Sequence, residues 1–260
     1  ETLRRLVDQA ARLKFNAVAF ELEDKFAYPS HPAIGQPQAF TPDQLRELTE
    51  YALDRHVQII PDVQAPAHMA YVLKHDQYAH LRCDGSNYQA CMTEPAAREL
   101  IFQMYADLID ATPGVEYFLI STDEVYYAGI CEKARPYTPE NRSQTWVDFA
   151  RAACEFVLAR GRRPILWAEY PLLARHVEQL PPEAINGVMT PTKDDDMVAA
   201  LNAHGMESLL YCPLQGSEKL FPDLFDSAGR DGRIRRGRIA VTLDHTSPRV
   251  AGRSRTIDRK

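Results

Sequence analysis

Apolar residues recur along this chain in two alternating patterns. The first 13 residues carry apolar side chains at helical spacing, and residues 15–21 follow as a short, nearly continuous apolar strand. Thr41, Pro42 and Gln44 supply the N-cap, first position and capping box of a second helix. The alternation then continues, with helices predicted at 41–56, 94–111, 140–160, 194–204 and 217–227, and strands at 57–63, 117–122, 164–167, 185–190, 208–212 and 239–243.

Repeated helix and strand units of this kind imply an α/β fold with a parallel sheet. No GxGxxG or GxxxxGK[ST] motif follows a strand, so the usual nucleotide-binding evidence for an open, doubly wound sheet is missing. The pattern therefore favours a (β/α)8 TIM barrel whose first strand precedes Glu1. We expect residues 1–248 to form this barrel and residues 249–260 to form a basic, poorly ordered tail.

Composition narrows the class of protein. The 260 residues are 45% hydrophobic and 25% charged, which excludes a disordered chain, and polar residues interrupt every apolar run before it could span a membrane. The net charge of -6 does not suggest a nucleic-acid binder, although residues 230–260 alone carry ten basic and three acidic residues. We interpret that basic stretch as a solvated terminus rather than a polyanion site.

The five cysteines stand without CxxC spacing. An odd number leaves at least one free thiol, which favours a reducing compartment such as the cytoplasm. The histidines show no HExxH or comparable ligand spacing, so the sequence calls for neither a metal nor a cofactor.

Polar and aromatic residues gather where the predicted strands end. In a TIM barrel the active site lies at the C-terminal ends of the strands, and acids with flat rings suit a sugar. Each residue alone could equally be a helix cap, a solvated loop residue or part of the core. Their recurrence in successive units favours a site, for which the candidates are Asp24, His68, Asp123, Glu124, Trp167, Glu169, Tyr211 and Asp244.

Asp123 and Glu124 form the most informative unit, at the end of an otherwise apolar strand. Two adjacent carboxyl groups repel each other, which favours a protonated form of one of them as a general acid. The same pair could instead cap the next helix and face its dipole, and the two residues alone leave both interpretations open.

The chain resembles the catalytic barrel of glycoside hydrolase family 20, the β-N-acetylhexosaminidases, and within it the hexosaminidase D-like branch. Four stretches carry the resemblance: FELEDKFAYPSHP, IIPDVQAPAH, LISTDEVYYAG and RPILWAEY. The family places a His and two glycines before its Asp-Glu pair, where this chain has Leu119, Ser121 and Thr122. Leu243 stands where the family has a Trp in its last strand, with Asp244 after it.

The resemblance implies exo-hydrolysis of terminal GlcNAc or GalNAc by a retaining, substrate-assisted mechanism. The sugar's own acetamido oxygen attacks the anomeric carbon, Glu124 protonates the leaving oxygen, and Asp123 holds the acetamido N–H. By the same resemblance His68 supports the acids, while Trp167 and Tyr211 surround the acetamido group. An amino-sugar glycan is then the partner.

Two other functions remain open at this point. One is a catalytically weakened barrel that binds amino sugars or glycans. The other is a barrel glycosidase with an ordinary carboxylate nucleophile, which needs a second acid about 5 Å from Glu124 across the site. Glu169 and Asp244 are the candidates for that second acid.

Overall fold

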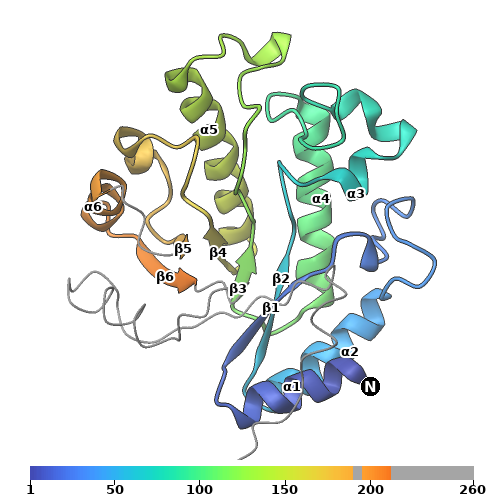
Figure 1. Cartoon of the computed structure of the whole chain (residues 1–260). Helices are drawn as coiled ribbons and strands as arrows, with labels where there is room; N and C mark the ends of the chain where they lie inside the picture. Colours follow the sequence, from blue (N-terminus) through green and yellow to red (C-terminus); the bar gives the residue numbers. More distant parts are fainter. Residues whose placement is uncertain (190–194, 212–260) are drawn as a thin grey trace, which may run out of the picture.

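Six parallel strands form one sheet in the computed structural model, which describes residues 1–189 and 195–211 (Figure 1). Each strand lies beside its predecessor in the chain, in the order β1 to β6. A doubly wound sheet would reverse direction at a switch point, whereas a barrel adds strands in sequence. The prediction of a TIM-barrel type of sheet is therefore confirmed, with strands β1 Ala17–Glu21, β2 Gln58–Asp62, β3 Tyr117–Leu119, β4 Arg163–Leu166, β5 Ile185–Met189 and β6 Glu207–Tyr211.

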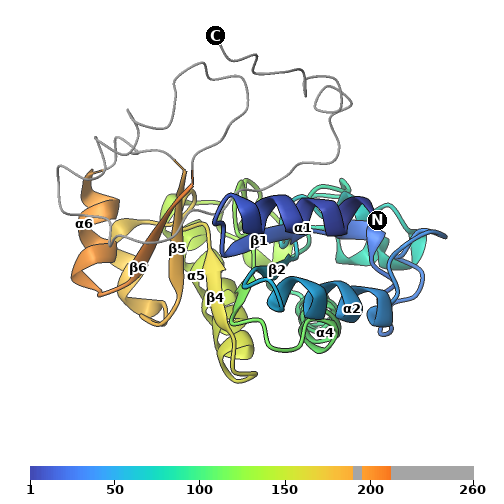
Figure 2. The same ribbon diagram turned by 90° about the horizontal axis from the view of Figure 1, so that it is seen from below.

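Helices connect the strands and pack beside one another around the sheet (Figure 2). Helix α2 packs on β2 and α5 on β4, while α4 contacts both α2 and α5. Short 3-10 helices cover Glu23–Lys25, Asp76–Leu81, Glu132–Ala134 and Ala174–Gln179. The α-helices are α1 Thr2–Arg12, α2 Pro42–Leu53, α3 Ala70–Leu73, α4 Pro95–Ala111, α5 Pro139–Leu158 and α6 Asp195–Ala203.

The helix starts follow from local sequence. Thr41 accepts a hydrogen bond from the backbone of Gln44, whose side chain in turn accepts one from the Thr41 N–H, as the capping box predicts. Helix α5 begins the same way, with Thr138 capping the backbone N–H of Asn141. Such N-caps contribute about 1 kcal/mol each, so they fix where the loops from the strands end.

The sheet separates two apolar clusters. The larger one fills the space between strands and helices and includes Val18, Phe20, Ile59 and Phe118. The smaller one lies on the opposite face of the sheet and comprises Ala19, Ile60, Tyr117, Leu119, Ile165, Ile185 and Leu209. Burial on both faces explains why the strands read as nearly continuous apolar runs. We call the smaller cluster the inner apolar cluster. Because it covers that face of the sheet with apolar side chains, polar chemistry is confined to the ends of the strands.

The third strand is shorter than predicted. It ends at Leu119 rather than at Thr122, although the backbone N–H of Ile120 still donates to Ile165. Ser121 and Glu124 have positive φ values of 35° and 51°, which turn the backbone out of the sheet. The strand therefore gives way to a tight turn just where the two acids stand.

Several predicted features lie outside the described residues. These are the helix at 217–227, the strand at 239–243 and the tail at 249–260. Among the described residues, no helix is both long enough and apolar enough to cross a membrane.

Candidate active site

Asp123 and Glu124 occupy the turn that follows β3, at the C-terminal edge of the sheet. The two side chains differ in exposure: Asp123 is 23% exposed and Glu124 is 48% exposed. Asp123 Oδ1 is buried and has no hydrogen-bond partner within the described part of the chain. One acid thus faces inward with an unused acceptor atom, while its neighbour reaches toward solvent.

His68 joins the two acids. Its Nε2 atom lies 3.4 Å from Asp123 Oδ2 and 3.2 Å from Glu124 Oε2. The hydrogen bond with Asp123 raises the pKa of His68, against an opposing effect of burial, and the charges of both acids add to the rise. The prediction that His68 stands beside the acids therefore agrees with the geometry. The raised pKa favours the charged form of His68, which then contacts both carboxyl groups.

Tyr88 completes this contact and had no place among the residues predicted from sequence. Its hydroxyl donates to the backbone oxygen of Glu124 at 3.0 Å and lies 3.5 Å from both Glu124 Oε2 and His68 Nε2. The ring also packs edge-on against His68. Tyr88 comes from a loop rather than a strand end, so the strand pattern gave no signal for it.

Asp62 is a buried acid that contacts the turn through Ser121. Asp62 ends β2, is 2% exposed, and accepts a 2.6 Å hydrogen bond from Ser121 Oγ. Burial raises the pKa of Asp62 well above its ordinary value, and the charge of Glu21 raises it further. Ser121 adopts a positive φ, which glycine tolerates better. The family resemblance places a glycine at this position. The hydrogen bond to Asp62 gives the serine that stands here a buried partner for its hydroxyl group.

Thr122 ties the turn to the neighbouring strand. Its Oγ1 donates to the backbone oxygen of Trp167 at 3.1 Å, and its own backbone oxygen accepts from Trp146 Nε1 at 3.0 Å. Ser121 and Thr122 thus replace the small residues of the family pattern with side chains that hold the turn in place. Both are fully buried, so they leave the shape of the site to the acids above them.

Trp167 follows β4 directly and packs partly buried against the inner apolar cluster. Its indole covers Gly187 of β5 so closely that a Cβ atom there would lie 2.3 Å from the ring. Because Cβ contacts that short do not occur, only glycine at this position lets the ring lie flat on the strand. The ring's position at the inner edge of the sheet fits the predicted wall of a sugar pocket.

Glu169 contacts the turn from the side of β4. Its Oε1 atom accepts a 2.9 Å hydrogen bond from the backbone N–H of Glu124. Burial raises the pKa of Glu169, and the charges of Asp123 and Glu124 act in the same direction. This contact holds the main chain of Glu124.

Asp24 is held by two lysines. Its oxygens lie 2.7 Å from Lys25 Nζ and 2.9 Å from Lys74 Nζ. Partial burial opposes the effect, but the hydrogen bonds from Lys25 and Lys74 lower the pKa of Asp24. The ion pairs fasten the loop after β1 to the end of α3, and a sugar contact of Asp24 remains a prediction. Tyr211 is the last residue of β6, but its side chain and all of Asp244 lie outside the described residues.

A rim of tyrosines borders the acids. Tyr126 and Tyr170 are 43% and 46% exposed, and their ring centroids lie 5.9 Å apart. Arg142 stacks over Tyr170 and over Tyr137, with its guanidinium 4.6 Å and 4.3 Å from the two rings. Exposed aromatic faces beside a pair of acids provide a surface on which sugar rings can stack.

Comparison with known proteins agrees with this arrangement. The chain is 26% identical over 207 residues to hexosaminidase D of Bos taurus, covering 75% of the chain and 58% of that protein. It is 29% identical over 204 residues to hexosaminidase D of Homo sapiens, covering 75% of the chain and 41% of that protein. The chain therefore spans about half the length of the curated relatives it matches.

Solved structures share the fold. The N-acetyl-β-hexosaminidase of Streptomyces plicatus aligns with a TM-score of 0.63 at 20% identity, covering 81% of this chain and 44% of that one. The exo β-N-acetylglucosaminidase of Vibrio harveyi aligns with a TM-score of 0.69 at 16% identity, covering 94% and 47%. The catalytic-domain profile of glycosyl hydrolase family 20 matches residues 1–211, which include the acids, His68 and Trp167. The chain belongs to glycosyl hydrolase family 20.

Proposed function

We propose that this protein is an exo-acting β-N-acetylhexosaminidase that removes terminal GlcNAc or GalNAc with retention of configuration. The contrast between the two acids carries the proposal: Asp123 is mostly enclosed with a buried, unpaired Oδ1, while Glu124 is half exposed. Two carboxyl groups in different environments suit two different tasks on one sugar.

In the proposed reaction the acetamido oxygen of the sugar attacks the anomeric carbon and displaces the leaving group. Asp123 accepts a hydrogen bond from the acetamido N–H through Oδ1 and stabilises the positive charge that forms on the oxazolinium ring. Glu124 donates a proton to the departing oxygen and afterwards takes one from the water that opens the ring. Adjacent acids are suited to this chemistry because both act on neighbouring parts of the same sugar.

His68, Tyr88 and Glu169 position the acids. Protonated His68 spans both carboxyl groups, and Tyr88 and Glu169 hold the backbone oxygen and N–H of Glu124. With its main chain held on both sides, Glu124 keeps its carboxyl group at the mouth of the site. The tyrosine rim lies where a sugar or other leaving group can stack, next to the acid that protonates it.

The test compares leaving groups in two variants. Glu124→Gln keeps the shape of the side chain but cannot donate a proton, so turnover of poor leaving groups should fall by about 10²–10⁴-fold and turnover of activated aryl glycosides by less. Asp123→Asn should slow both kinds of substrate alike and should weaken binding of a thiazoline inhibitor that mimics the oxazolinium ring. Wild-type rates in both variants, or equal cleavage of substrates that lack the acetamido group, would contradict the proposal.

Glu169→Gln separates this mechanism from one with an enzyme nucleophile. If Glu169 only accepts from the Glu124 N–H, its amide keeps the acceptor oxygen, and turnover should fall by about tenfold or less. A nucleophile would lose nearly all activity in this variant. In Glu169→Ala, which leaves room for an anion, azide would restore turnover and give a glycosyl azide of inverted configuration. Absence of turnover in the wild type together with GlcNAc binding would instead identify a sugar-binding barrel.

A further inference from the structure

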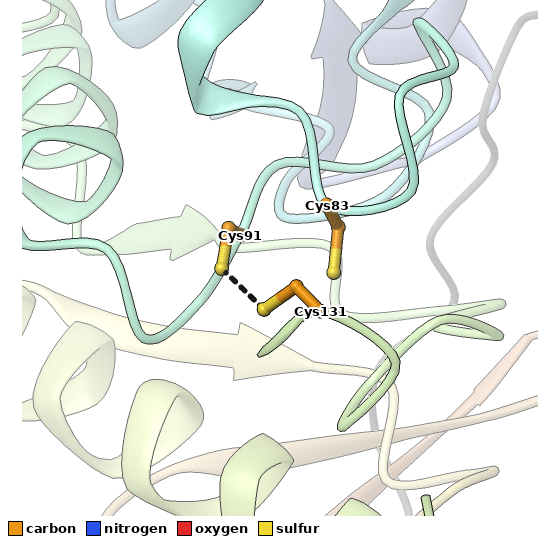
Figure 3. Close-up of side chains that lie close together, drawn as sticks. All are labelled: Cys83, Cys91 and Cys131. Carbon is orange, nitrogen blue, oxygen red and sulfur yellow. Dashed lines mark hydrogen bonds between the residues drawn. The ribbon is translucent and has the colours of Figure 1, made fainter. Parts of the chain in front are cut away.

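Three cysteines from two segments that are far apart in the sequence converge in the fold (Figure 3). Cys83 and Cys91 flank the loop that carries Tyr88, and Cys131 follows the turn that carries the acids. Their sulfur atoms all lie within 4.8 Å of one another, and Cys91 Sγ is 3.0 Å from Cys131 Sγ. We refer to Cys83, Cys91 and Cys131 as the cysteine cluster.

Hydrogen bonds hold the Tyr88 loop at its two ends and against the segment after the turn. The N–H of Cys83 donates to Gln89 and that of Cys91 to Leu81, which fixes the two ends of the loop against each other. The Cys83 thiol donates to the backbone oxygen of Tyr127 at 3.2 Å, and zinc binding would release this proton to solvent. The cluster therefore forms from two segments that side-chain hydrogen bonds already connect, rather than from three independent surface residues.

We propose that the cysteine cluster binds a zinc ion. Zinc–thiolate bonds of about 2.3 Å in a tetrahedral site place sulfur atoms roughly 3.8 Å apart, so the observed spacings bracket the required value. A set of three thiolates selects a thiophilic ion such as zinc over magnesium or calcium, which require oxygen ligands. Cys83 and Cys91 are 8% and 5% exposed, while Cys131 is partly exposed, so solvent supplies the fourth ligand on the side of Cys131.

The ion has a structural role in this arrangement. Its ligands do not include either acid, but it fastens the Tyr88 loop to the segment that follows Glu124. Gln89 Oε1 already accepts from the backbone N–H of Tyr127 at 2.9 Å between the same two segments. Bound zinc adds three strong bonds to that connection and thereby limits the motion of Tyr88 relative to Glu124.

Metal titration of the whole 260-residue chain tests the site directly. The protein is purified under reductant, freed of metal with a chelator, and titrated with zinc against a chromophoric competitor and separately with cobalt. We expect equimolar zinc binding and a thiolate-to-cobalt charge-transfer band in the near ultraviolet. Absence of that band and of stoichiometric zinc binding in the wild type overturns the proposal.

Serine variants locate the ligands. Loss of an outer-sphere partner lowers metal affinity by 10–100-fold, so replacing a direct ligand in Cys83→Ser, Cys91→Ser or Cys131→Ser should lower zinc affinity by at least ~100-fold. Cys154→Ala is the matched control, because Cys154 is a buried free cysteine on α5 and not a member of the cluster. Unchanged affinity in Cys83→Ser, or loss of zinc in Cys154→Ala, contradicts the assignment.

A measurement on the wild type covers the case in which a variant does not fold. Alkylation followed by peptide mass spectrometry should show zinc slowing the modification of Cys83, Cys91 and Cys131 by at least tenfold, reversed by chelator. Equal labelling with and without zinc overturns the proposal. A Cys91–Cys131 disulfide formed with an added oxidant, in a protein that binds no zinc when reduced, identifies a redox pair instead and also overturns it.

Discussion

The acid pair and the cysteine cluster lie close together along the chain but differ in how their residues are spaced. Asp123 and Glu124 are neighbours in the sequence and stand at the end of one strand. The cysteines are eight and forty residues apart and meet only when the Tyr88 loop packs on the segment after the turn. Chemistry placed at a strand end can be predicted from sequence, whereas chemistry assembled from two loops cannot.

The two regions also differ in their demands on geometry. The acid pair acts on a substrate, so small displacements of Glu124 alter turnover. The cysteine cluster, in our proposal, fixes main chain, so its loss should first appear in stability and only then in turnover. Tyr88 joins the two, because it lies between Cys83 and Cys91 and donates to Glu124. Variants of the acid site, of the cysteine cluster and of Tyr88 can therefore test whether the two regions act separately.

Among variants that keep both acids, the largest effect is expected for His68→Gln, which removes the charge between the acids. Hydrogen bonds to charged groups contribute about 1.5–3 kcal/mol, so kcat/KM should fall by roughly 10- to 100-fold while zinc content stays unchanged. The hydrogen bond with Asp123 raises the pKa of His68 above the ordinary value of 6.5. The charged form of His68 therefore contributes fully to stability below pH 6.5, and this contribution is lost as the pH rises through the raised pKa.

Thermal unfolding measured at several pH values tests whether the stabilisation by His68 decreases as the pH rises. The difference in Tm between wild type and His68→Gln should be largest under acidic conditions and should shrink as His68 loses its proton. His80→Gln, at an exposed position, is the control and should leave the profile unchanged. Parallel wild-type and His68→Gln profiles would show that the charge on His68 does not hold the acids together.

Features at strand and helix ends could be predicted from sequence, whereas contacts between separate loops could not. The consecutive strands, the capping box at Thr41 and the position of His68 beside the acids all agree with expectation. The signals for the strands and the capping box are local, since each depends on residues within one element or at its end. The place of His68 beside the acids is implied by the family resemblance. Tyr88 and Asp62 were missed because the first lies in a loop without periodicity and the second reads as an interior strand position.

A smaller effect is expected for Tyr88→Phe. The ring still packs on His68, but the hydroxyl no longer donates to Glu124. A neutral hydrogen bond contributes about 0.5–1.5 kcal/mol, so kcat should fall by roughly 2- to 10-fold, with KM and zinc affinity nearly unchanged.

Removing zinc from the wild type should also lower kcat, and it should lower Tm as well. If chelation changed kcat equally in wild type and in Tyr88→Phe, the two regions would not communicate through the Tyr88 hydroxyl.

The smallest effect on turnover is expected for Asp62→Asn, which acts below the turn. Burial raises the pKa of Asp62, so the folded state holds this proton more tightly than the unfolded chain, whose value is near 3.8. Its contribution to stability is therefore complete below that value and is lost as the pH rises through the raised value.

Asparagine keeps an acceptor oxygen for Ser121 and cannot ionise. The stability of Asp62→Asn relative to wild type should consequently increase as the pH rises from about 4, which is near the unfolded value for aspartate. Denaturant unfolding at several pH values measures this slope. Asp54→Asn, at an exposed position after α2, provides the control and should show no slope of its own. A flat difference between Asp62→Asn and wild type would mean that Asp62 is already ionised in the folded protein, and that the Ser121 turn rests on a buried carboxylate rather than on a neutral acid.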